Sequence, residues 1–163
     1  MSLGHQDIVQ VCGPLQVHCF ERRYFGFSQA LKSAGIKVDP ERNIIGNMST
    51  EFGQQAALEV ARMNPLPTAV FVHNDETAVG LMHGLKNLDI RVPNDISIIG
   101  YDDMPYASVF NPELTTLHLP RQEWGRQACK LLISILDPEP DLETMVIIPP
   151  TLVIRKSTGS VRQ

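Results

Sequence analysis

The stretch at residues 68–72 (TAVFV), with the residues that follow it at 73–75 (HND), decides the fold class of this chain. It is rich in β-branched side chains and carries no charge, which is typical of a strand buried on both faces of a parallel sheet. Apolar residues then recur at helical spacing from Ala78 to Leu88, and Asp75 is the expected N-cap of that helix. A buried strand leading into an amphipathic helix is half of a βαβ unit.

The same alternation extends in both directions along the chain. Strands are expected at residues 7–12, 43–46, 96–100 and 115–119, and further helices at residues 20–34, 52–63 and 124–135. Gly35 and Pro65 are expected to end the first two of these helices, and Pro120 to open the last. Residues 137–141 (DPEPD) predict a surface loop, and residues 145–154 a final extended run. This alternation predicts an α/β fold, a parallel sheet flanked by helices.

Composition sets the broad class of the protein. The chain has 163 residues, a net charge of −4 and 43% hydrophobic residues, which indicates a globular domain rather than a disordered chain. No apolar run reaches the roughly 20 residues that a membrane-spanning helix needs. The acidic balance argues against a general nucleic-acid binder. Cys12, Cys19 and Cys129 lack zinc-site spacing and are expected in the core or beside a pocket.

Signals of catalysis are absent from the sequence. There is no dinucleotide-binding, phosphate-loop, nucleophile-elbow or zinc-protease motif, so we expect no enzyme activity, no catalytic residue, no metal site and no cofactor. The five histidines lack ligand spacing, and each is expected to be exposed or hydrogen-bonded. A small α/β enzyme stays open as a third reading, but its nucleophile or metal cluster is not found.

Polar residues that follow the expected strands are the candidate binding residues, because ligands of open parallel sheets bind at the carboxyl ends of the strands. Arg23 is one position off the apolar stripe of its helix, where a guanidinium could bind hydroxyls or a carboxylate. Asn74 and Asp102 each follow a buried strand, and either could bind a ligand or form a turn. Asp103 could equally cap the turn toward Met104.

Several blocks of sequence, taken in order, resemble the effector-binding domain of LacI/GalR-family transcriptional regulators. The resemblance runs from about residue 7 to residue 158. It rests on residues 23–27 (RYFGF), 67–80 (PTAVFVHNDETAVG), 92–103 (VPNDISIIGYDD), 112–116 (PELTT) and 152–158 (LVIRKST).

This resemblance implies a periplasmic-binding-protein-like type I fold, of which the chain holds mainly the C-terminal lobe. It implies a cytoplasmic homodimer that senses a small-molecule effector, a sugar or nucleoside-like compound and chiefly a carbohydrate, with no membrane partner. Operator DNA would be bound only through an N-terminal helix-turn-helix absent from these residues. The alternative is a periplasmic-type sugar-binding protein of a transport system.

The resemblance also implies roles for particular residues. Arg23 would donate to the effector, Asn74 would hydrogen-bond it, and Asp102 would accept from its hydroxyl groups. Met48 stands where relatives often place a stacking aromatic side chain and would give an apolar contact instead. Val17 and Cys19 lie on a stretch that can contact the effector.

The family topology implies a division of the chain. Residues 1–6 are expected to be a tag or linker, 7–114 the C-terminal lobe, 115–136 a segment crossing toward the other lobe, 137–158 the return, and 159–163 a tail. The crossing helix, which contains Trp124, should expose an apolar stripe and pack aberrantly, exchange with a second copy or form a dimer contact. Effector binding by these residues alone should be weak.

Overall fold

A four-stranded parallel sheet forms the centre of the protein in the computed structural model, which describes residues 3–136 and 145–161. Its strands lie in the order β2-β1-β3-β4. Val9 of β1 is paired with Val70 of β3, and Val70 in turn with Ile98 of β4. The bounds of the strands are β1 Ile8–Cys12, β2 Asn43–Ile45, β3 Ala69–Val72 and β4 Ser97–Ile99. The predicted α/β fold with a parallel, helix-flanked sheet is confirmed.

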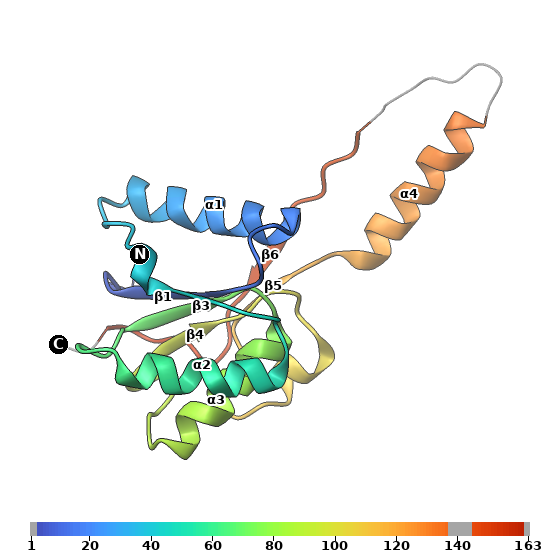
Figure 1. Ribbon diagram of the computed structural model, residues 1–163. Helices are drawn as coiled ribbons and strands as arrows, with labels where there is room; N and C mark the ends of the chain where they lie inside the picture. The colour runs from blue at the N-terminus through green and yellow to red at the C-terminus, as the bar shows by residue number, and fades with distance from the viewer. Residues whose placement is uncertain (1–2, 137–144, 162–163) are drawn as a thin grey trace.

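Three helices flank the sheet (Figure 1). α1 (His18–Ser33) lies over one face, while α2 (Thr50–Arg62) and α3 (Asp75–Asn87) lie side by side over the other. The buried core is on the α2 and α3 side, where valines of β1 and β3 meet the leucines of α3. Two short 3-10 helices, η1 (Pro40–Arg42) and η2 (Pro105–Ser108), complete the connections.

Among the residues expected to begin or end helices, two take positions that differ by one from the expected ones. Gly35 adopts a φ of +71° just after α1, as expected for the residue that ends a helix. Asn74, rather than Asp75, is the N-cap of α3, because its side-chain oxygen accepts the N–H of Thr77. Pro120 is likewise the N-cap of the last helix rather than its first residue.

The sheet face beneath α1 is only partly covered, which corrects the expectation that β3 is buried on both faces. Ala69 and Phe71 of β3 are half-buried, whereas Val70 and Val72 on the opposite face are buried. A groove of about 1000 Å³ runs between α1 and the strands. Among the described helices α1 alone lies over this face, and a single helix is too narrow to cover four strands.

The C-terminal part of the chain leaves the sheet. β5 (Thr116–His118) and β6 (Thr151–Val153) form a separate antiparallel pair, and β5 leads into α4 (Arg121–Ile135). In Figure 1, α4 projects away from the sheet and its helices. Every described residue of α4 is at least partly exposed. The apolar stripe expected on this helix is therefore open to solvent at least in part, at Trp124, Ala128, Leu131 and Ile135. The neighbouring Leu132, Ile133 and Leu136 are exposed as well. The predicted loop at 137–141 lies outside the described residues.

Two further sequence expectations concern membrane insertion and the cysteines. None of the described helices is long and apolar enough to cross a bilayer. Cys12 is buried, and burial raises the pKa of its thiol to about 11. Cys19 is exposed beside the groove, which agrees with the expectation of a core or pocket-side residue. Cys129 is exposed on α4 and is therefore not in the core.

Candidate functional site

The carboxyl ends of β1, β3 and β4 bring the predicted binding residues to one edge of the sheet. Arg23 lies in the second turn of α1, which follows β1. Asn74 directly follows the buried His73 at the end of β3, and Asp102 follows Tyr101 just after β4. Parallel strands direct all three connections to the same edge.

The Arg23 guanidinium is held by an aromatic ring and a main-chain carbonyl. Its Cζ lies 3.8 Å from the centroid of the Tyr101 ring and 5.7 Å from that of Phe20. One Nη1–H donates to the carbonyl oxygen of His73. Arg22, by contrast, is exposed, because it lies about 100° further round the helix than Arg23. Arg23 is therefore fixed at the sheet edge rather than free in solvent.

Asp102 shares the charge environment of Arg23. Burial raises the pKa of its carboxyl above the ordinary range, while the positive charges of Arg23 and Arg121 act in the opposite direction. Arg121, the first residue of α4, lies 3.5 Å from the Asp102 carboxylate. The backbone of Asp102 has a φ of 121°, a conformation that is rare outside glycine. A carboxylate acceptor thus stands beside guanidinium donors, a combination suited to a ligand with both donors and acceptors.

The amide of Asn74 makes two hydrogen bonds within the protein, one from its nitrogen and one to its oxygen. It donates to the carbonyl oxygen of Met48 at 3.0 Å and accepts the N–H of Thr77 at 2.9 Å. The side chain of Met48 is 6% exposed and packs in the core, and its backbone has a φ of 65°. Val17 is the exposed N-cap of α1, and Cys19 is exposed one turn before Arg23. Of the six predicted residues, Arg23 and Asp102 interact electrostatically, and Asn74 and Met48 form a separate pair.

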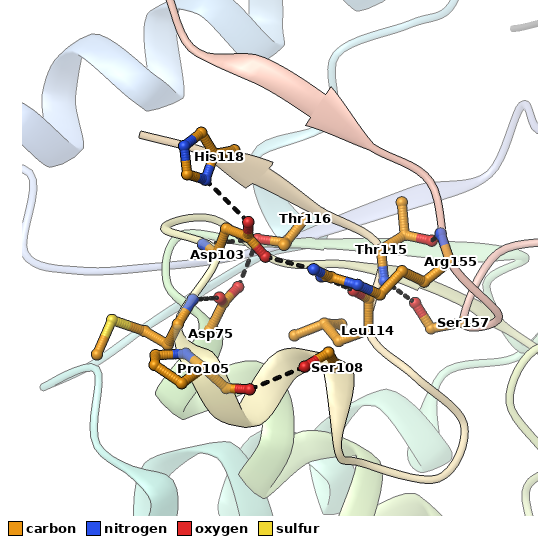
Figure 2. Close-up of polar contacts among 11 residues, drawn as sticks. Asp75, Asp103, Pro105, Ser108, Leu114, Thr115, Thr116, His118, Arg155 and Ser157 are labelled. Carbon is orange, nitrogen blue, oxygen red and sulfur yellow. Dashed lines mark hydrogen bonds and ion pairs between the residues drawn. The ribbon is translucent and has the colours of Figure 1, made fainter. Parts of the chain in front are cut away.

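A second polar network joins β5 and the segment after β6, here called the crossover strands, to the edge of the sheet (Figure 2). Asp103 accepts from Arg155 at 2.6 Å and pairs with His118 at 2.9 Å. Burial acts to raise the pKa of Asp103, but the hydrogen bonds from Arg155 and His118 bring it below its ordinary value. Asp103 therefore joins β5 to the segment after β6 instead of capping the turn toward Met104.

The cap of that turn is Asp75, a residue that sequence reasoning placed only at the start of a helix. It is fully buried and accepts the N–H of Met104 at 2.8 Å and the hydroxyl of Thr116 at 2.6 Å. Burial raises the pKa of this carboxyl despite those bonds. Asp75 thus links α3, the turn after β4 and the crossover strand β5, as Figure 2 shows.

His73 is hydrogen-bonded, as expected for a histidine that is not exposed, but through only one of its two ring nitrogens. It is fully buried beside Gln10, with which it shares one hydrogen bond, and its Nδ1 has no partner among the described residues. Its ring packs against Phe20 and Phe71. Burial, assisted by the positive charge of Arg23, lowers the pKa of His73 to about 3, so the imidazole is neutral.

The sequence did not point to Tyr101 or Arg121 as parts of this site. Both lie next to predicted features, since Tyr101 precedes Asp102 and Arg121 opens the last helix. Tyr101 contacts Arg23, about 80 residues away in the sequence, and Arg121 contacts Asp102, about 20 residues away. A spacing pattern in the sequence does not reveal contacts between segments so far apart. The described residues contain no group of three metal-binding side chains.

Comparison with known proteins gives a consistent family relationship. The family model described as periplasmic binding protein-like domain matches residues 1–158. The chain is 36% identical over 157 residues to the HTH-type transcriptional repressor PurR of Pasteurella multocida, covering 96% of this chain and 47% of that protein. It is 38% identical over 155 residues to PurR of Photorhabdus laumondii, covering 94% and 45%. The chain thus spans about half the length of these relatives.

Solved structures of LacI-family proteins give the same family relationship. A LacI-family regulatory protein from Chloroflexus aggregans superposes with a TM-score of 0.91 at 26% identity, covering 96% of this chain and 56% of that one. The Lac repressor dimer bound to operator and the anti-inducer ONPF has a TM-score of 0.89 at 30% identity, covering 98% and 55%. A sugar-binding LacI-family regulator from Escherichia coli, complexed with phosphate, has a TM-score of 0.89 at 25% identity, covering 98% and 57%.

Proposed function

Because the chain belongs to the family of periplasmic binding protein-like domains and is an effector-binding portion of a LacI-family regulator, we propose that it senses a small molecule for a DNA-binding transcriptional repressor. The observation that carries this proposal is the Arg23 guanidinium, held on the Tyr101 ring beside the Asp102 carboxylate at the carboxyl edge of a parallel sheet. Such an edge is where open α/β sheets bind their ligands.

The effector is, in this proposal, a sugar or nucleoside-like molecule. Both candidates present hydroxyl groups that a guanidinium and a carboxylate can bind together. The similarity to PurR repressors favours a purine-type compound over a carbohydrate. The likeness to a sugar-binding LacI-family regulator supports the carbohydrate. Arg23 and Asp102 would bind either one directly, with Val17 and Cys19 at the edge of the site. Asn74 and Met48 would shape its floor.

Operator binding and dimerisation belong to the whole parent protein in this proposal. The relatives are described as HTH-type repressors, which supports a helix-turn-helix outside these 163 residues. The Lac repressor structure is described as a dimer on operator DNA, which supports a homodimer. Sensing would then work by differential affinity, because an effector that binds one arrangement of the dimer more tightly shifts the population toward it. A cytoplasmic location follows from a role on DNA.

Residues 7–114 and the return segment within 137–158 would form one lobe of the sensor, and residues 115–136 would cross to another. This division is supported by the separate β5–β6 pair and by α4, which projects from the sheet with its apolar stripe exposed. The transport-protein alternative is not favoured, since the curated relatives are transcriptional repressors. Their role also supports a sensor rather than an enzyme.

Titration calorimetry of the intact parent protein against guanosine, ribose and galactose tests the proposal. At least one compound should bind, and Arg23→Ala should weaken that binding by about 1.5–3 kcal/mol if it removes a charge-assisted hydrogen bond. Arg22→Ala, one residue away and exposed, is the matched control and should leave the affinity unchanged. Equal effects of the two substitutions would contradict the assigned site.

A further inference from the structure

Three contacts hold the Arg23 guanidinium before any ligand arrives, and the most distant is the Phe20 ring, whose centroid lies 5.7 Å from the Arg23 Cζ. The Tyr101 ring lies against it at 3.8 Å, and the His73 carbonyl accepts one of its N–H groups. Arginine has five N–H donors, and Arg23 makes no other hydrogen bond within the described part of the chain. The remaining donors are therefore available in a set position.

The carbonyl of His73 is itself rigidly placed. His73 is fully buried at the end of β3, bonded to Gln10 and packed between Phe20 and Phe71. A single hydrogen bond to this carbonyl fixes one nitrogen of the guanidinium but leaves the plane free to turn. The Tyr101 ring supplies a second constraint, since the attraction between a guanidinium and an aromatic face keeps the guanidinium over that ring.

Tyr101 also immediately precedes Asp102 in the chain. Asp102 has a φ of 121° and Asp103 one of 53°, and Asp103 is fastened by Arg155 and His118. The turn that carries the Tyr101 ring is therefore anchored to the crossover strands. This one short turn therefore carries both the Tyr101 ring, which holds the donor Arg23, and the acceptor Asp102.

We propose that Tyr101 is a positioning residue for effector recognition, whose ring face holds the Arg23 guanidinium so that its free N–H groups and the Asp102 carboxylate act on one ligand. This inference rests on the proposed effector role of Arg23. The hydroxyl of Tyr101 plays no part in it, so phenylalanine replaces tyrosine without loss. Preorganisation of this kind strengthens binding by removing the cost of ordering a long side chain.

Reaction of the full chain with phenylglyoxal, followed residue by residue by mass spectrometry, tests the proposal without a ligand. Arg23 should react equally slowly in the wild type and in Tyr101→Phe, and about fivefold faster in Tyr101→Leu, the factor expected for loss of a cation–π contact. Arg22 is the internal control and should react at one rate throughout. Tyr24→Leu, on the same helix, controls for loss of a tyrosine and should leave Arg23 slow.

A second readout links the ring to binding. In the intact parent protein, guanosine or ribose at millimolar concentration should protect Arg23 from phenylglyoxal in the wild type and in Tyr101→Phe, and protect it several-fold less in Tyr101→Leu. Circular dichroism of each variant confirms that it is folded. Equal Arg23 reactivity in the wild type and Tyr101→Leu would overturn the proposal, as would a phenylalanine variant that behaves like leucine. Absence of protection in every variant, with the reactivity difference intact, would instead contradict the proposed effector class and support the positioning role of the ring.

Discussion

Asp103 offers the most direct test of how the crossover strands are held to the sheet edge. Asp103→Asn keeps the size of the side chain and removes its charge, which faces Arg155 at 2.6 Å and His118 at 2.9 Å. Asparagine also tolerates the left-handed backbone at this position, where φ is 53°. The substitution therefore isolates the electrostatic contribution of the network.

The loss of unfolding free energy expected for Asp103→Asn follows from the exposure of Arg155 and His118, the two partners of Asp103. Asp103 and Arg155 have side chains that are both 15% exposed, so their contact is little screened by water. A hydrogen bond to a charged group contributes about 1.5–3 kcal/mol and a neutral one about 0.5–1.5 kcal/mol, so the charge itself accounts for about 1–1.5 kcal/mol. The His118 contact is half exposed and adds about 0–1 kcal/mol. Arg155 retains its bond to the carbonyl of Leu114, which limits the penalty. We expect a total loss of about 1–2 kcal/mol.

Urea denaturation at pH 7, followed by circular dichroism, measures this loss as a lower midpoint with an unchanged m-value. The corresponding drop in melting temperature is roughly 2–8 °C for a domain of this size. Glu113→Gln is the matched control, because it removes the charge of an ion pair with Lys156 whose lysine side chain is 71% exposed. That change should cost less than about 0.5 kcal/mol.

The pH dependence has a definite sign. Because the folded-state pKa of Asp103 lies below its ordinary value, its contribution is present above the unfolded pKa of about 3.9 and is lost as the pH falls through the folded value. The difference between the wild type and Asp103→Asn should therefore shrink below about pH 4. If Asp103→Asn and Glu113→Gln cost the same at pH 7, the reasoning from burial is refuted.

Three further outcomes are expected. His73 stays neutral in the folded protein, where its pKa is about 3, against about 6.5 in the unfolded chain. Acidification from pH 7 to 4 should therefore lower the free energy of unfolding by about 3 kcal/mol. Urea titrations of His73→Gln should show a smaller change in the free energy of unfolding with pH than those of the wild type. Gly100→Ala would place a Cβ 2.3 Å from the Asp75 carboxylate and should lower the free energy of unfolding by about 1–3 kcal/mol. Gly26→Ala, on α1 with open space around it, should raise the free energy of unfolding by about 0.5–1 kcal/mol. Thermal melts that rank the two variants in the opposite order would refute this reasoning. Ile133→Ser on α4 should change the unfolding free energy by less than about 0.5 kcal/mol, because the side chain is exposed, and a larger loss would mean that α4 is packed in solution.

Much of the secondary structure was predictable because its signals are local. The apolar run of β3 and the helical spacing after it depend only on neighbouring residues, and both elements are present. The N-cap of α3 was misplaced by one residue, since Asn74 and Asp75 are both good caps and only the contact with Thr77 distinguishes them. Asp75 then proved to be a buried link to Met104 and Thr116, which its type and position do not indicate.

The candidate site was predictable to the level of single residues but not of their connections. Arg23 is indicated by its position at the edge of the apolar stripe of its helix and Asp102 by its place after a strand, and their roles toward an effector stay predictions. Tyr101 stands with Asp102 among the residues that follow a strand, but only its distance from Arg23 indicates that it belongs to the site. The half-open face beneath α1 was also missed, because an uncharged strand has the same sequence whether a helix covers it or not.

By itself, then, the sequence of this protein determined the order and type of its elements and the edge of the sheet at which polar residues gather. Periodicity, caps and strand ends are properties of short segments, and they act over a few residues. Only the tertiary structure decided that Tyr101 holds Arg23, that Asp103 joins Arg155 to His118, and that α4 projects from the sheet. Those outcomes depend on which distant segments meet and how much water they exclude, and the strength of each charge contact is set by that exclusion.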